Sequence, residues 1–380
     1  MIDVHAESLQ SLRERTSEKW RAYPEDVIPL FVAEMDYPLA EPIAEALTEA
    51  VRRSDTGYAR PGGELPRAFA DFAARRWGWQ VDPAQVTTTA DVAVVVVEAL
   101  RLAIRPGDGV VINPPVYPPF FDFVPEAGGR IVEVPLLQNA AGWSIDLDGL
   151  ECAFAAGARA YLLCNPHNPL GHPHPADQLA AVAELAARYG VTVVSDEIHA
   201  PLTLSDGVFT PFLSVSDAAR EHGIAAESAS KAWNLAGLKC AMFVTAGERM
   251  SRLLATLPES VRYRTGLFGQ IASTVAFAEG EEWLDGAIRA LERNRDALTT
   301  LLDEKLPGVG YLAPRASYLA WLDFRALGWG DDPSIRALEN GRVALSSGPM
   351  FGTQGAGFAR LNFACSPEVL GEAVDRLAGA

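Results

Sequence analysis

The stretch ARAYLLCNPHNPLGHPHPADQLAAVAELAARYGVTVVSDEIH (158–199) decides the fold. It begins with an apolar run at 158–165 and continues through a loop rich in Asn and Pro. Helical periodicity follows over 176–190, and a second apolar run occupies 191–198. Gly190 stands where the left-handed C-cap of a helix is expected. Strand, helix and strand in this order predict parallel strands that are covered on both faces.

Similar apolar runs recur on both sides of this stretch. Most are β-branched and bounded by Gly, Pro, Asn or Asp, which is typical of strands. They are VTTTA (86–90), GVVINPPVY (109–117), GRIVEVPL (129–136), IAAESAS (224–230) and CAMFVTA (240–246). A further helical stretch, DVAVVVVEALRLAI (91–104), separates the first two. The alternation predicts an α/β protein with a mostly parallel seven-stranded sheet.

The character of the sequence changes near residue 280. EEWLDGAIRALERNRDALTTLLDEKL (281–306) has the charge pattern of one long amphipathic helix. A smaller α+β section follows it to the C-terminus. We therefore expect a large domain over 41–280, and a small domain formed by 281–380 together with the N-terminal segment 1–40.

Composition narrows the classes of function. The formal net charge is −17 and the pI is about 4.8, so the surface repels phosphate backbones and disfavours nucleic-acid binding. Four widely separated cysteines form no CxxC pair, which suits a reducing compartment. The polar N-terminus lacks the apolar core of a secretion signal, and no apolar run approaches the ~18 residues of a membrane span. We expect a cytoplasmic protein with no membrane segment.

Polar clusters follow three of the predicted strands, at Asn165–Asn168, Asp196–His199 and Ser228–Lys231. Ligands of parallel sheets bind beyond the carboxyl ends of the strands. Taken singly, these clusters have simpler interpretations: a turn, a helix N-cap and a solvated lysine. Together they suit pyridoxal 5′-phosphate (PLP), which bonds to a lysine amine, needs an aspartate at its protonated ring nitrogen and accepts an asparagine amide at its hydroxyl.

The segment ESASKAWNLAGLK (227–239) places hydroxyls and a second cation around Lys231. Ser228, Ser230 and Lys239 supply the groups that a phosphate requires. We therefore predict that Lys231 holds the cofactor and that its neighbours hold the cofactor phosphate.

Eight stretches then resemble a known family in order along almost the whole chain. They are FVAEMDYP (31–38), TGYARPGG (56–63), PPVYPPF (114–120), NPHNPLG (165–171), SDEIHAPL (195–202), SASKAWNLAGLK (228–239), ASYLAWLDF (316–324) and GFARLNFAC (357–365). The chain resembles fold-type I PLP enzymes of the class I/II aminotransferase superfamily. Within that superfamily it is most similar to the cystathionine β-lyase, or C–S lyase, branch called MalY/PatB.

The resemblance implies roles for the residues around the cofactor ring. Lys231 would form the Schiff base and move the Cα proton, and Asp196 would pair with the pyridinium nitrogen. Asn168 and His199 would contact the ring hydroxyl. Tyr117 would stack on the ring, a contact worth ~0.5–1.5 kcal/mol beyond its burial.

The resemblance also implies how the phosphate and the substrate are held. Ser228 and Lys239 would bind the phosphate of the same chain. Tyr58 would reach the phosphate and substrate of a neighbouring subunit, which implies a homodimer with shared active sites. Arg360 would clamp the substrate α-carboxylate in a bidentate pair.

Several positions depart from the family pattern. The turn that would contact the cofactor phosphate has the sequence Ala90-Asp91-Val92, where the family often has a Pro-Gly or Ser-Gly turn. The carboxylate of Asp91 would repel a phosphate unless it caps the helix and points away from the phosphate. The backbone amides of Asp91 and Val92 could still bind the phosphate. Leu170 replaces a usual threonine, and 262–270 is unusual. GHPHP (171–175) has no matching cysteine or carboxylate cluster, so we expect no metal site.

Three functions remain open on the sequence alone. The first is a β-lyase that cleaves L-cystathionine or related cysteine S-conjugates to a thiol, pyruvate and ammonia. The second is an aminotransferase that passes the amino group to a 2-oxo acid. The third, of another class, is a regulator that binds a transcription factor. FVAEMDYP, DEIH and PPVYPPF favour the lyase.

Overall fold

A computed structural model describes residues 2–139 and 142–380. Its largest sheet has seven strands, and β10 runs in the direction opposite to the other six. The strands in spatial order are β2 (Val86–Thr89), β10 (Ala241–Val244), β9 (Gly223–Glu227), β8 (Thr192–Asp196), β7 (Ala160–Cys164), β3 (Gly109–Ile112) and β4 (Arg130–Glu133). The predicted seven-stranded, mostly parallel sheet is confirmed. The strand predicted at 109–117 ends at Ile112, because the prolines that follow cannot donate to the ladder.

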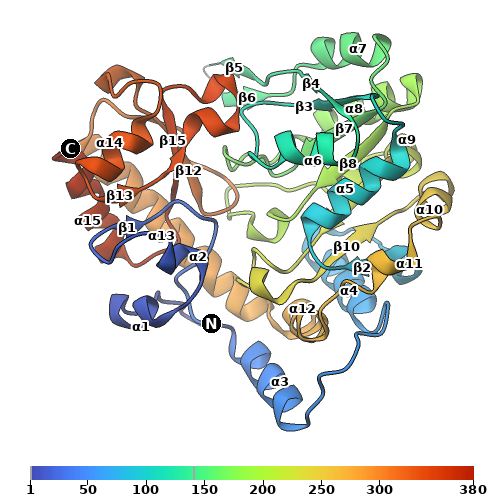
Figure 1. The fold of residues 1–380 in the computed structure, drawn as a ribbon, viewed down its shortest axis with the longest axis horizontal. Coiled ribbons are helices and arrows are strands. Elements are labelled where there is room, and N and C mark those ends of the chain that lie inside the picture. Colours follow the sequence, from blue (N-terminus) through green and yellow to red (C-terminus); the bar gives the residue numbers. More distant parts are fainter. Residues whose placement is uncertain (1, 140–141) are drawn as a thin grey trace.

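Helices cover both faces of this sheet (Figure 1). The helices of this part are α3 (Glu41–Arg52), α4 (Leu65–Trp77), α5 (Val92–Ala103), α6 (Phe120–Glu126), α7 (Leu147–Ala155), α8 (Ala176–Tyr189), α9 (Asp217–His222), α10 (Glu248–Leu254), α11 (Glu259–Arg262) and α12 (Leu267–Glu279). Neighbouring residues of β7 point to opposite faces: Leu162 belongs to the core that contains Val96 of α5, and Leu163 belongs to the core that contains Leu179 of α8. As expected, α8 stops at Gly190, which adopts a left-handed φ of 69°.

The predicted long helix is α13 (Glu281–Lys305), which packs against α15 (Pro367–Ala378). Beside them lies a four-stranded sheet. Its strands, in spatial order, are β11 (Gly310–Tyr311), β12 (Leu319–Asp323), β15 (Phe358–Asn362) and β14 (Ser346–Ser347). Further elements are the antiparallel pair β5 (Leu137–Asn139) and β6 (Gly142–Ser144) and the helix α14 (Pro333–Glu339). The domain limits at 41–280 and 281–380 stay a prediction. No helix within the described ranges is long and apolar enough to cross a membrane.

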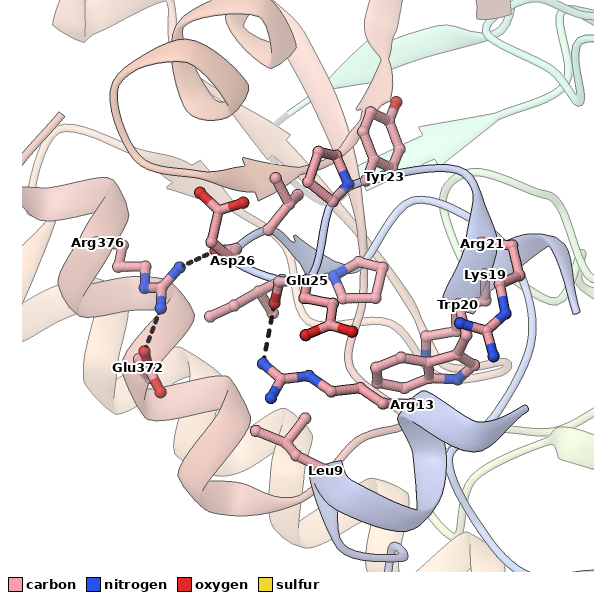
Figure 2. Close-up of a pocket in the computed structure, with 14 residues that line it drawn as sticks. Leu9, Arg13, Lys19, Trp20, Arg21, Tyr23, Glu25, Asp26, Glu372 and Arg376 are labelled. Atoms are coloured by element: carbon pink, nitrogen blue, oxygen red, sulfur yellow. Dashed lines mark hydrogen bonds and ion pairs between the residues drawn. The ribbon is translucent and has the colours of Figure 1, made fainter. Parts of the chain in front are cut away.

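The N-terminal segment folds back on the C-terminal part of the chain (Figure 1). It contains α1 (Leu9–Glu14), α2 (Glu18–Arg21) and β1 (Ile28–Pro29), and β1 pairs in parallel with β13 (Val343–Ala344). A cavity of about 230 Å³ lies between this segment and α15 (Figure 2). Arg376 donates to the Asp26 carbonyl at 2.8 Å, and Arg13 donates to the Glu25 carbonyl at 2.9 Å. The first bond fastens the segment to α15, and the second joins α1 to the chain that precedes β1.

A buried ion pair secures the same segment from its inner side. Lys19 Nζ lies 2.7 Å from Asp36 Oδ1, and the side chains of the two residues are 0% and 1% exposed. Lys19 also donates to the Glu34 carbonyl at 3.1 Å. Burial raises the pKa of Asp36 even though Lys19 opposes that shift. Desolvation of Asp36 therefore outweighs its attraction to Lys19. Removing either partner would leave the other as an unpaired buried charge, which destabilises the fold.

We predict that Lys19→Met lowers the free energy of unfolding by about 3–5 kcal/mol, because Asp36 is left as an uncompensated buried charge. The double variant Lys19→Met/Asp36→Leu should regain most of the loss. Urea titration of the three proteins measures the effect. As a control, Arg53→Met breaks the exposed pair with Glu49 and should cost about 0.5 kcal/mol or less. An equal loss in the single and double variants would contradict the prediction.

Candidate active site

A cavity of about 310 Å³ lies beyond the carboxyl ends of β3, β7, β8 and β9, with β15 of the smaller sheet as its opposite wall. The buried strands end in polar residues there because side chains that need water or a ligand cannot sit inside a sheet covered on both faces. Most of the predicted site residues line this cavity. They are Asp91, Val92, Tyr117, Asn168, Asp196, His199, Lys231, Lys239 and Arg360.

Lys231 lies in the turn after β9, and its Nζ donates to the Ala33 carbonyl at 3.1 Å. Tyr318 Oη donates to the same carbonyl at 3.0 Å. Burial and, to a smaller extent, the nearby Arg360 lower the pKa of Lys231, whereas Asp196 opposes the shift, and the resulting pKa is about 8. The neutral amine, the form that a nucleophile or a proton acceptor must take, is therefore more populated near neutral pH than in an ordinary lysine.

Asp196 is the last residue of β8, and it is 5% exposed. The backbone N–H of Ile198 donates to its Oδ1 at 3.2 Å. Burial raises the pKa of Asp196 to about 6, although that hydrogen bond and Lys231 both favour the ionised form. A cationic group in the cavity would restore the carboxylate, and a protonated ring nitrogen is such a group.

Arg360 occupies the middle of β15 and is 6% exposed. One Nη donates to Asn168 Oδ1 at 3.0 Å, and the other donates to the Phe31 carbonyl at 3.0 Å and to Ser346 Oγ at 3.1 Å. Its Nε is buried and has no acceptor among the described residues. Burial lowers the pKa of Arg360 to about 10. This fixed, incompletely satisfied guanidinium is suited to a carboxylate.

Asn168 and His199 are held in place from behind the cavity. Asn168 Oδ1 accepts a hydrogen bond from Arg360. The Nδ2 amide of Asn168 is therefore the group that can donate to a ligand. His199 Nδ1 lies 3.0 Å from Ser317 Oγ, and burial lowers the pKa of His199 to about 3. The imidazole is therefore neutral. Tyr117 lies at the cavity wall, edge to face with Phe120 at 6.0 Å.

Two predicted residues do not line the cavity. The Ser228 hydroxyl lies 2.7 Å from the Cys240 carbonyl and 2.9 Å from Ser230 Oγ, so Ser230 is the serine that reaches the cavity. This arrangement favours Ser230 over Ser228 as the direct phosphate ligand. Tyr58 is 95% exposed in the loop between α3 and α4. Its predicted contact with a neighbouring subunit stays a prediction.

Asp91 is the N-cap of α5, as its sequence position suggested. Its Oδ1 accepts the backbone N–H of Val94 at 3.0 Å. Its Oδ2 does not turn away from the cavity but lies 3.2 Å from Lys239 Nζ. The backbone N–H groups of Val92 and Ala93 have no acceptor among the described residues and lie at the cavity wall. A helix N-terminus, a lysine and a serine hydroxyl thus surround one end of the cavity.

One buried feature could not be read from the motifs. Glu197 follows Asp196, Glu227 ends β9, and the two residues are 0% and 1% exposed. Glu197 Oε1 accepts from Ser195 Oγ and from the Phe212 N–H, both at 2.8 Å. The other oxygens, Glu197 Oε2 and Glu227 Oε1, have no donor among the described residues. The two carboxyls interact, and burial raises the pKa of both. A shared proton would satisfy them and hold together the strands that carry Asp196 and lead to Lys231.

Comparison with known proteins agrees with this geometry. The sequence profile of the aminotransferase class I and II family matches residues 25–377. A protein of Mycobacterium tuberculosis strain H37Rv is 47% identical over 397 residues, covering 97% of this chain and 96% of that protein. The cystathionine beta-lyase of Corynebacterium glutamicum is 38% identical over 377 residues, covering 97% and 98%. The crystal structure of cystalysin from Treponema denticola, which contains a pyridoxal 5′-phosphate cofactor, superposes with a TM-score of 0.91 at 27% identity, covering 100% and 98%.

The sheet and its cavity have the fold-type I architecture of PLP-dependent transferases. The chain belongs to the aminotransferase class I and II family.

The cavity fits the cofactor of such enzymes. Its volume of about 310 Å³ lies at the lower end of the usual range for small-molecule sites, about 300–1,000 Å³. It offers an amine at Lys231, a carboxyl in need of a cation at Asp196, and free amides at Val92 and Ala93. No group of three His, Cys, Asp or Glu suited to a metal ion occurs in the described part of the chain.

The carboxyl pair predicts a pH dependence of stability. The pKa of Glu197 is raised from 4.5 to about 7, so the folded chain holds a proton that the unfolded chain has released. That contribution is complete below the unfolded pKa and is lost as the pH rises through about 7. Glu197→Gln/Glu227→Gln keeps an amide-to-carbonyl bond and removes both titrations. We expect its free energy of unfolding, measured in urea at about pH 5 and about pH 8, to fall less with pH than that of the native chain.

The matched control is Glu248→Gln, which changes an exposed carboxyl and should leave the pH dependence as it is. Asp196 titrates over part of the same range and should retain a residual slope in all three proteins. An unchanged slope in the double variant would mean that the two glutamates do not share a proton.

Proposed function

We propose that the protein is a PLP-dependent C–S β-lyase, which cleaves L-cystathionine or related cysteine S-conjugates to a thiol, pyruvate and ammonia. The observation that carries this proposal is the convergence of Lys231, Asp196 and Arg360 on one cavity. The cystathionine beta-lyase relative at 38% identity over nearly the whole chain supports the choice of substrate class. The roles of the individual site residues are part of the proposal.

Each end of the cofactor has a counterpart in the cavity. Asp196 would hold the proton on the ring nitrogen, because a buried carboxyl with a raised pKa is restored to its ionised form by a cation. Asn168 Nδ2 and the neutral His199 would orient the ring hydroxyl. Tyr117 would lie against the ring. When bound, PLP supplies an aldehyde for the substrate amine and a ring that withdraws the electrons left at the substrate Cα.

The phosphate end is a separate set of donors. The N–H groups of Val92 and Ala93 open α5 and are free to bind an anion. Ser230 Oγ and Lys239 Nζ line the same end of the cavity. Together they would anchor the phosphate of the cofactor.

The remaining residues act on the substrate. Arg360 would bind the α-carboxylate, since its Nε has no acceptor among the described residues and its Nη groups are already oriented. This contact would place the Cα hydrogen toward Lys231. Lys231 Nζ, with a pKa lowered to about 8, would accept that proton. Departure of a thiolate from Cβ then completes the elimination.

An aminotransferase on the same scaffold is the runner-up. Aspartate or glutamate, whose side-chain carboxylate has no ammonium group beside it, would need a further cation, and among the described cavity residues the cations are Lys231, Lys239 and Arg360. Each of these already has a role. The lyase-type motifs FVAEMDYP, DEIH and PPVYPPF favour elimination.

We also propose a homodimer in the cytoplasm. Tyr58 is 95% exposed and lies outside its own chain's cavity, as a residue that serves a neighbouring subunit would. Figure 1 shows that α3, which precedes this loop, projects from the lower edge of the molecule. The four cysteines are free, which suits a reducing compartment.

We predict sustained release of pyruvate and free thiol from L-cystathionine by the PLP-loaded protein, with no 2-oxo acid present. Elimination regenerates the cofactor in each cycle, whereas transamination stops after one half-turnover without an acceptor. Lys231→Ala should abolish turnover and change the visible absorbance, and the surface variant Lys305→Arg should behave like the native chain. A single half-turnover by the native chain would favour the aminotransferase.

We predict that Arg360→Lys raises KM for L-cystathionine by about tenfold or more, because a lysine cannot form the bidentate pair. The kcat should fall less, since the carboxylate contact is made in the ground state and the transition state alike. The visible absorbance of the bound cofactor should be unchanged. Arg342→Lys, which alters an exposed bidentate pair with Asp26, is the control. An unchanged KM for Arg360→Lys would remove Arg360 from the substrate site.

A further inference from the structure

Asp91 places a negative charge at the end of the cavity that the cofactor phosphate would occupy. The residue lines the cavity together with Val92, Ala93 and Lys239. Its side chain is 35% exposed and that of Lys239 is 60% exposed. Within the described ranges, Asp91 is the carboxylate that pairs with Lys239, at 3.2 Å. The cation offered to a phosphate is therefore already engaged.

The two carboxylate oxygens of Asp91 have different tasks. Oδ1 caps α5 through the Val94 N–H at 3.0 Å, which holds the carboxylate at the helix start. Oδ2 faces Lys239. Lys239 itself has a left-handed backbone with φ of 59°, and its neighbours η4 (Ala236–Leu238) and β10 fix that turn. The Asp91 carboxylate cannot move far without breaking the cap, and the turn fixes the backbone position from which the Lys239 side chain extends.

We propose that Asp91 competes with the cofactor phosphate for Lys239, so that this chain retains PLP less tightly than a neutral residue at position 91 would allow. The inference rests on the proposed function, because it takes PLP as the occupant of the cavity. It goes beyond that function by assigning Asp91 a role in cofactor exchange.

Two anions, the Asp91 carboxylate and the cofactor phosphate, would compete for the single cation of Lys239. A phosphate that binds the amides of Val92 and Ala93 lies near Lys239 and also near Asp91. It gains attraction from the lysine, but it must displace or share the Asp91 contact and it is repelled by that carboxylate. Because both side chains are partly exposed, water and salt weaken each of these terms. The expected effect is thus moderate and depends on ionic strength.

Asp91→Asn tests the proposal, because asparagine caps a helix about as well as aspartate but carries no charge. Equilibrium dialysis of the holoenzyme against decreasing PLP, read by visible absorbance and protein fluorescence, gives the dissociation constant. We expect Asp91→Asn to bind PLP about fivefold to tenfold more tightly at low ionic strength, and the gain should shrink as salt is added. Asp91→Ser, a second neutral cap, should behave in the same way.

Lys239→Ala distinguishes competition from simple repulsion. If Asp91 acts by engaging Lys239, the gain from Asp91→Asn should be much smaller in the Lys239→Ala background. An equal gain in both backgrounds would overturn the competition and leave only repulsion. Pyridoxal, which lacks the phosphate, should bind native and Asp91→Asn proteins alike.

The outcomes separate this inference from the proposed function. A native chain that takes up no PLP would overturn both. A native chain that binds PLP and releases pyruvate from L-cystathionine, while Asp91→Asn binds PLP no more tightly, would overturn the role of Asp91 alone. Tighter binding by both neutral variants, with loss of the gain in the Lys239→Ala background, supports it.

Discussion

Burial of the parallel strands on both faces is the constraint on which the rest of the structure depends. Strands such as β7 and β8 have every residue buried, so polar side chains collect where the strands end. Because β7, β8 and β9 run parallel, those ends meet at one edge. Asn168, Asp196 and Lys231 therefore converge on the cavity through the strands that carry them.

Desolvation in that cavity then determines the chemistry. It lowers the pKa of Lys231, raises that of Asp196 and lowers that of Arg360. Each pKa is thereby shifted toward the uncharged form of the group. A partner of opposite charge or a hydrogen-bonding partner would stabilise the charged form. A ligand with a cationic ring and a carboxylate meets these needs. The same physics operates behind the site, where burial raises the pKa of Glu197 and Glu227 and favours a shared proton.

The features that could be predicted from the sequence are those that local patterns encode. All seven strands of the large sheet, the Gly190 cap and the helix α13 follow from apolar runs, turn residues and periodicity. The strand-end clusters followed from the rule for parallel sheets. Contacts between distant segments could not be predicted in this way. Ser317 behind His199 and Ser346 behind Arg360 are examples, because each partner is brought in by the tertiary fold.

Asp91 shows how one residue can serve stability and oppose ligand binding. A glycine at this turn would leave the backbone free for a phosphate, but it would provide no side chain to cap α5. A good cap contributes roughly 1 kcal/mol to a helix, and α5 packs against β8, β9 and β10 at the centre of the sheet. The carboxylate secures that helix and at the same time occupies Lys239. In this chain, the same side chain therefore stabilises the helix that packs on the sheet and weakens the binding of the cofactor phosphate.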